Sequence, residues 1–198
     1  TAIEVAASVN QWGTVAKALG GDNVNVTSII NSTNVDAHDY EPTTSDIAKL
    51  QKAQVIIVNG AGYDAWAVKA AQTANAIIVN AAEIGGVNDG ENPHVWFSAD
   101  VRKAVAQAIT EAYEQADAAK KNDFDKMNDR WTAEENNVES KIAEVKQKTD
   151  GLAYAATESV ASYLAEDMGL ADATPSGYAR ATANESEPTP TDIKQFTD

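Results

Sequence analysis

Four short apolar runs in the first 80 residues constrain the fold more than any other feature of the sequence. They lie at residues 3–7, 24–30, 54–59 and 76–79, and segments with helical patterning separate them. The third run, Gln54-Val55-Ile56-Ile57-Val58-Asn59, is nearly continuous, as expected for a parallel strand buried on both faces. Strands that alternate with helices form parallel sheets. The sequence therefore predicts an α/β fold that begins with a Rossmann-like lobe.

A long helix is predicted from about residue 122 to residue 148. Its apolar residues recur at spacings of three, four and seven, with charged residues between them. This pattern indicates an amphipathic helix of ~40 Å that packs along a domain. A coiled coil is the alternative, but its apolar seam would be short. Residues 152–156 then predict another strand, followed by a polar turn and a helix that ends near Gly169.

Residues 41–50 are partly repeated at residues 187–196, where Glu, Pro, Thr, Asp and Ile are identical in register. In the first copy Thr43 and Asp46 have the spacing of a capping box at the start of a helix. Corresponding loops in two similar lobes would give such a repeat, and we expect the second lobe to be incomplete because the second copy lies at the end of the sequence. The Thr-, Ser-, Gly-, Pro- and Ala-rich segment at 171–187 is expected to be mobile.

The two histidines of the chain, His38 and His94, each lie in a polar, turn-forming segment that follows an apolar strand run. Imidazole is the commonest protein ligand for transition metals. Open α/β sheets bind their ligands in the loops at strand ends. A shared metal site is therefore the first hypothesis, and the alternative is that each histidine only makes hydrogen bonds within its loop.

Composition excludes several other classes of protein. The chain has no cysteine, which excludes a thiolate metal site, a redox CxxC motif and a catalytic cysteine. A formal net charge of -15 argues against nucleic-acid binding, which needs clustered Lys and Arg. No apolar run is long enough to span a membrane. No signal peptide is present, so we expect the sequence to begin at a mature end or at a trimmed boundary.

Two motifs resemble those of a known family. The first runs from His38 through Tyr40-Glu41-Pro42-Thr43 to Val58-Asn59-Gly60, and the second is Asn92-Pro93-His94-Val95-Trp96. Both are similar to the metal-ligand motifs of the metal-binding lipoproteins of manganese and zinc ABC importers (cluster A-I), and the resemblance extends from Ile3 to about Phe196. It implies two Rossmann-like lobes with parallel sheets joined by the long helix: a metal-binding lobe at 1–117, the helix at 118–149 and a partial lobe at 150–198.

The resemblance also implies a ligand set. His38 and His94 match the first two ligands, and Glu158 occupies the position of the third, which is histidine in some members of the family and glutamate in others. Without the resemblance, Glu158 would be explained by its favourable charge at the positive end of the following helix. The fourth ligand of the family is a carboxylate in a C-terminal stretch that this sequence lacks, so it is assigned to no residue here.

The resemblance further implies that the chain binds Mn²⁺ or Zn²⁺ as a transported ligand and delivers it to the membrane permease of an ABC importer. The short loop at 81–91, which has no histidine, favours manganese. The protein is then a monomer outside the cytoplasm, at the cell surface or in the periplasm, and any lipid anchor lies outside this chain. Two other functions stay open: a metal-dependent hydrolase with Asp39 or Glu41 as base, disfavoured because HExxH and GxSxG motifs are absent, and a surface adhesin.

Overall fold

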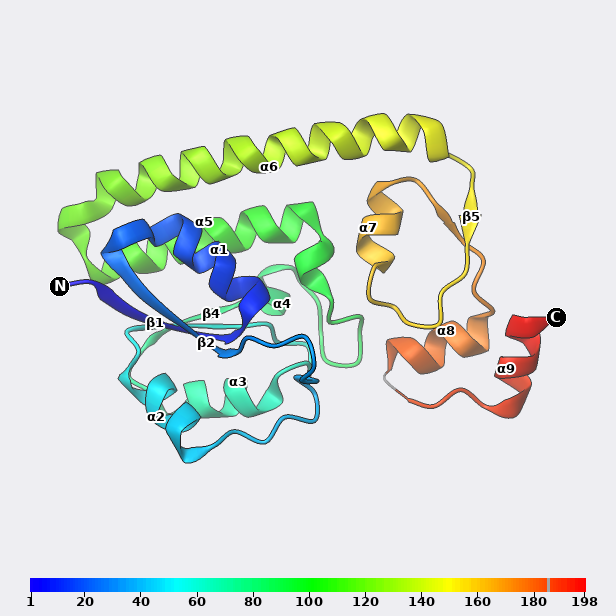
Figure 1. Cartoon of the computed structure of the whole chain (residues 1–198), viewed down its shortest axis with the longest axis horizontal. Coiled ribbons are helices and arrows are strands. Elements are labelled where there is room, and N and C mark those ends of the chain that lie inside the picture. Colours follow the sequence, from blue (N-terminus) through cyan, green and yellow to red (C-terminus); the bar gives the residue numbers. More distant parts are fainter. Residues whose placement is uncertain (185) are drawn as a thin grey trace.

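The computed structural model describes residues 1–184 and 186–198. Its first lobe is built on a four-stranded parallel sheet with strand order β2-β1-β3-β4 (Figure 1). All four strands coincide with the predicted apolar runs to within two residues, so the predicted parallel α/β lobe is confirmed. The strands are β1 (Ile3–Val9), β2 (Val24–Ile30), β3 (Val55–Val58) and β4 (Ile77–Asn80).

Helices cover both faces of this sheet (Figure 1). Alternate residues of β1 and β3 point to opposite faces and therefore enter two separate apolar clusters, one under α1 and α5 and the other under α2 and α3. All four residues of β3 are buried, as its continuous apolar sequence predicts. The helices and 3₁₀ turns of this lobe are α1 (Asn10–Gly20), η1 (Gly21–Asn23), α2 (Thr44–Lys52), α3 (Ala65–Ala71), α4 (Ala81–Ile84), η2 (Val95–Phe97), α5 (Ala99–Ala116) and η3 (Ala118–Lys120).

The long helix α6 (Lys121–Thr149) runs along the molecule from one lobe to the other (Figure 1). Its first part packs against α1 and α5, and Phe124 is fully buried there against Tyr113. Further along, Val138 and Val145 are exposed. The predicted bounds of the helix are confirmed to within one residue, and the helix contacts the first lobe as far as about Glu139.

A smaller second lobe follows α6. Two strands of two residues each, β5 (Ala153–Tyr154) and β6 (Ala171–Asp172), pair in parallel. The segment at 171–187 that we expected to be mobile contains β6 and helix α8, and Glu185 within it lies outside the described residues. The fold is thus α/β with two lobes joined by a long helix, and the described part of the second lobe has the smaller sheet. The helices are α7 (Ser162–Asp167), α8 (Ser176–Ala183) and α9 (Pro190–Thr197).

Within residues 1–184 and 186–198, none of the helices combines the length and the apolar character that crossing a membrane would require.

Candidate metal-binding site

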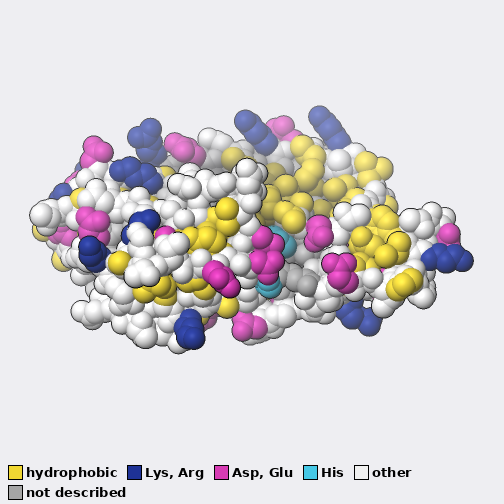
Figure 2. Space-filling view, turned by 60° about the horizontal axis from the view of Figure 1, so that its bottom comes forward, with side chains coloured by type: hydrophobic (Ala, Val, Ile, Leu, Met, Phe, Trp, Pro, Cys, Tyr) yellow, Lys and Arg dark blue, Asp and Glu magenta, His cyan; other side chains and the backbone are white. Residues whose placement is uncertain are grey.

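The two histidine loops emerge at the carboxyl ends of the parallel strands. Strand β1 lies between β2 and β3, so the chain leaves it to one side and later returns to its other side. Such a change of direction opens a crevice outside the strand ends, which is where open α/β sheets bind ligands. His38 follows β2, and His94 follows β4 and α4. In Figure 2 the histidine side chains reach the surface between the two lobes, beside acidic side chains.

The loop that carries His38 is fixed on both sides of the histidine. Ala37 is buried, and its carbonyl accepts a hydrogen bond of 3.0 Å from the indole Nε1 of Trp66. On the other side, the ring of Tyr40 packs edge-on against Trp66 at 5.0 Å, and its hydroxyl donates to Asp46. The histidine itself is exposed. These anchors hold its backbone while the imidazole stays accessible to a ligand.

His94 is half-buried and lies close to the same aromatic side chain as His38. The ring centroid of Tyr63 is 6.5 Å from that of His38 and 6.0 Å from that of His94. Burial lowers the pKa of His94; the charge of Asp36 opposes this shift and that of His38 adds to it. The structure therefore brings the two predicted histidines together, and it favours a neutral His94 imidazole, which is the form that binds a metal.

Beneath the histidines, a buried carboxylate organises the turn after β3. Asp64 is fully buried and accepts hydrogen bonds from the backbone N–H groups of Asn59 and Gly60, at 2.7 and 2.9 Å, and from the hydroxyl of Ser8. Burial raises the pKa of Asp64, and these hydrogen bonds act in the opposite direction. Gly60 has φ +78°, and a Cβ there would lie 2.2 Å from Asn80, so the turn requires glycine at this position.

Asn59 connects this turn to the second histidine loop. Its side-chain oxygen accepts from the indole Nε1 of the buried Trp12 at 3.0 Å, and its amide nitrogen donates to the carbonyl of Pro93 at 2.8 Å. These roles of Asn59, Asp64 and Ser8 were not predicted from the sequence. Asn59 and Asp64 follow the wholly apolar strand β3, where polar side chains are positioned to bond the loops, whereas Ser8 lies within β1 and gave no such signal.

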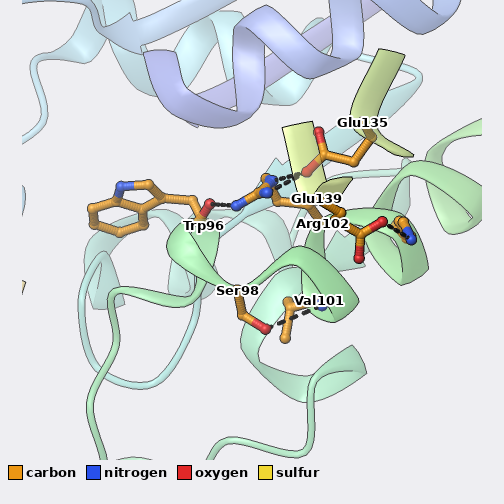
Figure 3. Close-up of polar contacts among 7 residues, drawn as sticks. Trp96, Ser98, Val101, Arg102, Glu135 and Glu139 are labelled. Atoms are coloured by element: carbon orange, nitrogen blue, oxygen red, sulfur yellow. Dashed lines mark hydrogen bonds and ion pairs between the residues drawn. The ribbon is translucent and has the colours of Figure 1, made fainter. Parts of the chain in front are cut away.

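An arginine joins the His94 loop to the long helix. Figure 3 shows Arg102 of α5 between the carbonyl of Trp96 and the carboxylate of Glu135 on α6. The guanidinium donates to the Trp96 carbonyl at 2.9 Å and through Nε to Glu135 at 2.7 Å. Lys103 and Glu139 form a second ion pair between the same two helices. Ser98 caps α5, since its hydroxyl accepts a hydrogen bond from the N–H of Val101. The end of the His94 loop is therefore attached to α6.

The third predicted ligand, Glu158, lies in the second lobe. Its side chain is exposed and lines a cavity of about 170 Å³ together with Asn92. The neighbouring residue Ser159 accepts a hydrogen bond from Asn92, two residues before His94. Over the part of the chain that the structure describes, no three His, Cys, Asp or Glu side chains converge closely enough to hold a metal ion. The structure thus brings the Glu158 segment to the His94 loop but does not assemble the three ligands, and the ligand set stays a prediction.

This arrangement has counterparts among known proteins. Residues 5–198 match the model of the family described as zinc-uptake complex component A, periplasmic, or ZnuA. The chain belongs to the ZnuA family. The match covers nearly the whole sequence, and it confirms at the level of the family the resemblance drawn from the two histidine motifs.

Individual members of the ZnuA family are distant relatives. The high-affinity zinc uptake system protein ZnuA of Bacillus subtilis (strain 168) is 24% identical in an alignment of 157 positions, which covers 69% of this chain and 49% of that protein. The metal ABC transporter substrate-binding lipoprotein FimA of Streptococcus parasanguinis is 25% identical over 91% of this chain and 62% of its own length. The chain thus spans from 49% to 62% of the length of these relatives.

The fold agrees as well. A crystal structure of ZnuA superimposes with a TM-score of 0.79 at 20% sequence identity, over 98% of this chain and 76% of that one. At this level of identity the likeness establishes the fold, and it confirms the two-lobe α/β architecture with a long helix.

Proposed function

We propose that this protein captures a divalent Mn²⁺ or Zn²⁺ ion through His38, His94 and Glu158 and delivers it to the permease of an ABC importer. The observation that carries the proposal is the meeting of the two histidines around Tyr63, at the crevice beyond the strand ends, in a chain of the ZnuA family. The ion is cargo, so the protein makes and breaks no covalent bond and is not an enzyme.

The chemistry of the site supports either ion. Imidazole nitrogen with carboxylate oxygen makes a borderline-to-hard ligand set, which both Mn²⁺ and Zn²⁺ accept. Because imidazole must be neutral to bind a metal, the lowered pKa of His94 keeps that ligand available in mildly acidic solution. The hydrogen bond between Asn92 and Ser159 keeps the Glu158 segment at the His94 loop, from where an approach of the second lobe would add the Glu158 carboxylate to the site.

We also propose a role for each part of the chain and a location for the protein. Residues 1–117 form the lobe with both histidines, residues 118–149 connect the lobes, and residues 150–198 supply Glu158. We infer a monomer outside the cytoplasm, periplasmic or at the cell surface, that presents both lobes to the permease and binds no nucleic acid. A lipid anchor outside this chain would be its attachment to the membrane.

Calorimetric titration of the metal-stripped chain with Mn²⁺ and with Zn²⁺ tests this proposal. We expect one ion to bind per chain, without turnover. His38→Ala and His94→Ala should each weaken binding by more than about 100-fold, because removing a ligand exceeds the 10–100-fold effect of removing a residue that orients one. Glu158→Ala should weaken binding too, whereas the exposed Glu166→Ala in the same lobe is the matched control and should not.

Two outcomes would contradict the proposal. Equal binding by the wild type and all three ligand variants would place the ion elsewhere. Metal-dependent cleavage of a model ester by the titrated protein, abolished by His94→Ala, would support the hydrolase alternative instead.

A further inference from the structure

Both polar groups of the Asn92 side chain make hydrogen bonds: the oxygen faces His94, and the amide nitrogen faces the second lobe. Its Nδ2 donates to the carbonyl of Ser159 at 3.0 Å. Its Oδ1 accepts from the backbone N–H of His94 at 3.2 Å and lies 2.6 Å from the ring nitrogen Nδ1 of that residue. The main-chain carbonyl of Asn92 also accepts from the hydroxyl of Tyr163 at 2.6 Å. Asn92 thus contacts both the candidate ligand His94 and the lobe that carries the candidate ligand Glu158.

The partners of Asn92 fix the direction of its amide. The carbonyl of Ser159 can only accept a hydrogen bond, so the NH₂ group must face it. The backbone N–H of His94 can only donate, so the amide oxygen must face His94. The atom opposite Nδ1 of the ring is therefore an acceptor, and Nδ1 must carry the proton. A neutral imidazole protonated at Nδ1 leaves the lone pair of Nε2 for a metal ion.

We propose that Asn92 is a positioning residue with two effects: it holds His94 in the tautomer that offers Nε2, and it ties this imidazole to the Ser159 segment of the second lobe. The inference rests on the proposed function for its purpose, since the fixed tautomer serves a metal. Oriented ligands are the usual result when the second nitrogen of a metal-binding histidine has a fixed hydrogen-bond partner.

A purely local role for Asn92 would not explain these contacts. The bond from its side-chain oxygen to the N–H two residues later is a common turn motif and needs no partner elsewhere. The amide nitrogen, however, bonds a carbonyl 67 residues away in the sequence. Asn92→Asp separates the two effects, because a carboxylate keeps both acceptor contacts with His94 and loses the 3.0 Å bond to the Ser159 carbonyl, leaving only a long contact of 3.5 Å from the Ser159 hydroxyl. Asn92→Leu removes every side-chain contact, while both variants keep the main-chain bond from Tyr163.

The test uses ¹⁵N NMR of the imidazoles in the metal-free full chain at about pH 8, above the ordinary histidine pKa. The chain has two histidines, so His38→Ala assigns both rings. We expect His94 of the wild type and of Asn92→Asp to be protonated at Nδ1, and Asn92→Leu to shift toward protonation at Nε2. Asn88→Leu, an exposed residue of the same loop, is the matched control and should leave the tautomer unchanged.

Hydrogen exchange of the same proteins measures the second effect. Both Asn92→Asp and Asn92→Leu should lose protection at residues 157–165, while Asn88→Leu should not. Protonation of wild-type His94 at Nε2, or unchanged protection in Asn92→Asp, would overturn the inference. If the tautomer and the protection behave as expected but the wild type binds neither Mn²⁺ nor Zn²⁺, the positioning role stands and the proposed function fails. If metal binds, Asn92→Leu should weaken it by about 10–100-fold.

Discussion

Helices α2 and α9 begin with nearly the same sequence but lie in very different surroundings. Each starts with a capping box: Thr43 and Asp46 exchange hydrogen bonds at the start of α2, and Thr189 and Asp192 do the same in α9. The local sequence repeat therefore gives the same local structure twice. Because capping depends on backbone groups within one turn, it needs no support from the rest of the fold.

The two helices differ in what covers them. Leu50 of α2 is fully buried against the sheet of the first lobe, in one cluster with Ile56 and Val58. Its counterpart in α9, Phe196, is half-buried against Tyr178, and Ile193 is 48% exposed. The same capping sequence thus leads to a core position in one lobe and to a surface position in the other.

The difference extends to the whole second lobe. Among the described residues, the fully buried apolar side chains end at Phe124, apart from Ala165. The first lobe also exposes Val35, Ile78 and Ile84, but it has a buried core beside them. The second half of α6 and the second lobe expose Val138, Val145, Leu152, Val160 and Ile193 with no comparable core, and Figure 2 shows a broad hydrophobic surface there. A helix start can be specified locally, but a core requires a sheet with enough strands to cover it.

The largest expected difference between the two copies comes from their apolar residues. Leu50→Ala should lower the free energy of unfolding by about 2–5 kcal/mol, because it leaves a cavity in a packed core. Phe196→Ala should cost less than about 1.5 kcal/mol, since it removes little more than one partly exposed aromatic pair. Urea denaturation followed by far-UV circular dichroism measures both, and equal costs would mean that the second lobe has a core comparable to the first.

Substitution of the two N-cap threonines should give a smaller difference in stability between the two copies. Thr43→Ala should destabilise the protein by about 1 kcal/mol, the usual value for loss of an N-cap. Thr189→Ala removes the same bond from a helix without a buried side chain, so it should increase hydrogen exchange in residues 190–197 with no change in the urea midpoint. Thr→Ser at either position keeps the hydroxyl and serves as the control. A urea midpoint that is lower for Thr189→Ala than for the wild type would show that α9 unfolds together with the first lobe.

The smallest expected difference between the two copies is in how the stability of the protein changes at acidic pH. Burial favours a raised pKa for Asp46, but hydrogen bonds from Tyr40 and Thr43 outweigh it, and the pKa is lowered. A carboxyl group whose pKa is lowered in the folded state stabilises the protein at pH values above its pKa in the unfolded state, which is about 3.9. This stability is lost as the pH falls through the pKa of the folded state. The stability gap between the wild type and Asp46→Asn should therefore narrow below about pH 4.

Asp192 provides the matched case. The side-chain and backbone hydrogen bonds from Thr189 lower its pKa as well. NMR titration should find both carboxyl pKa values below that of a free aspartate, while Asp192→Asn leaves the pH dependence of unfolding unchanged. If Asp192→Asn flattens this dependence as Asp46→Asn does, the two copies are equally coupled to global unfolding.

Much of the fold followed from local patterns. The strands, the long helix α6 and the cap at Thr43 depend on residues close together in sequence, and the structure confirms them. Helix α3 begins only at Ala65, after a turn in which residues 60–62 have positive φ. The Asp64 carboxylate bonds the backbone N–H groups of Asn59 and Gly60 and fixes this turn, so the helix begins after it.

The candidate site was predictable in part. His38 and His94 were identified because each follows a strand, and their meeting at Tyr63 follows from the parallel sheet. The contacts beneath and beside them were not predictable, since Ser8 bonds Asp64 across 56 residues and Asn92 bonds Ser159 across 67. Pairs so far apart leave no periodic pattern in a single sequence.

The attachment of α6 has a mechanical consequence. The helix is fixed to α5 as far as Glu139 and then continues to Thr149, about ten residues or ~15 Å further. Beyond this span the hydroxyl of Thr149 bonds the carbonyl of Met168 in the second lobe. Because the second lobe is attached at the end of this span, a tilt of the helix by about 5° at Glu139 would displace the second lobe by ~1.3 Å, from the rise per residue. The ion pairs between α5 and α6 therefore fix the part of the helix from which the second lobe extends.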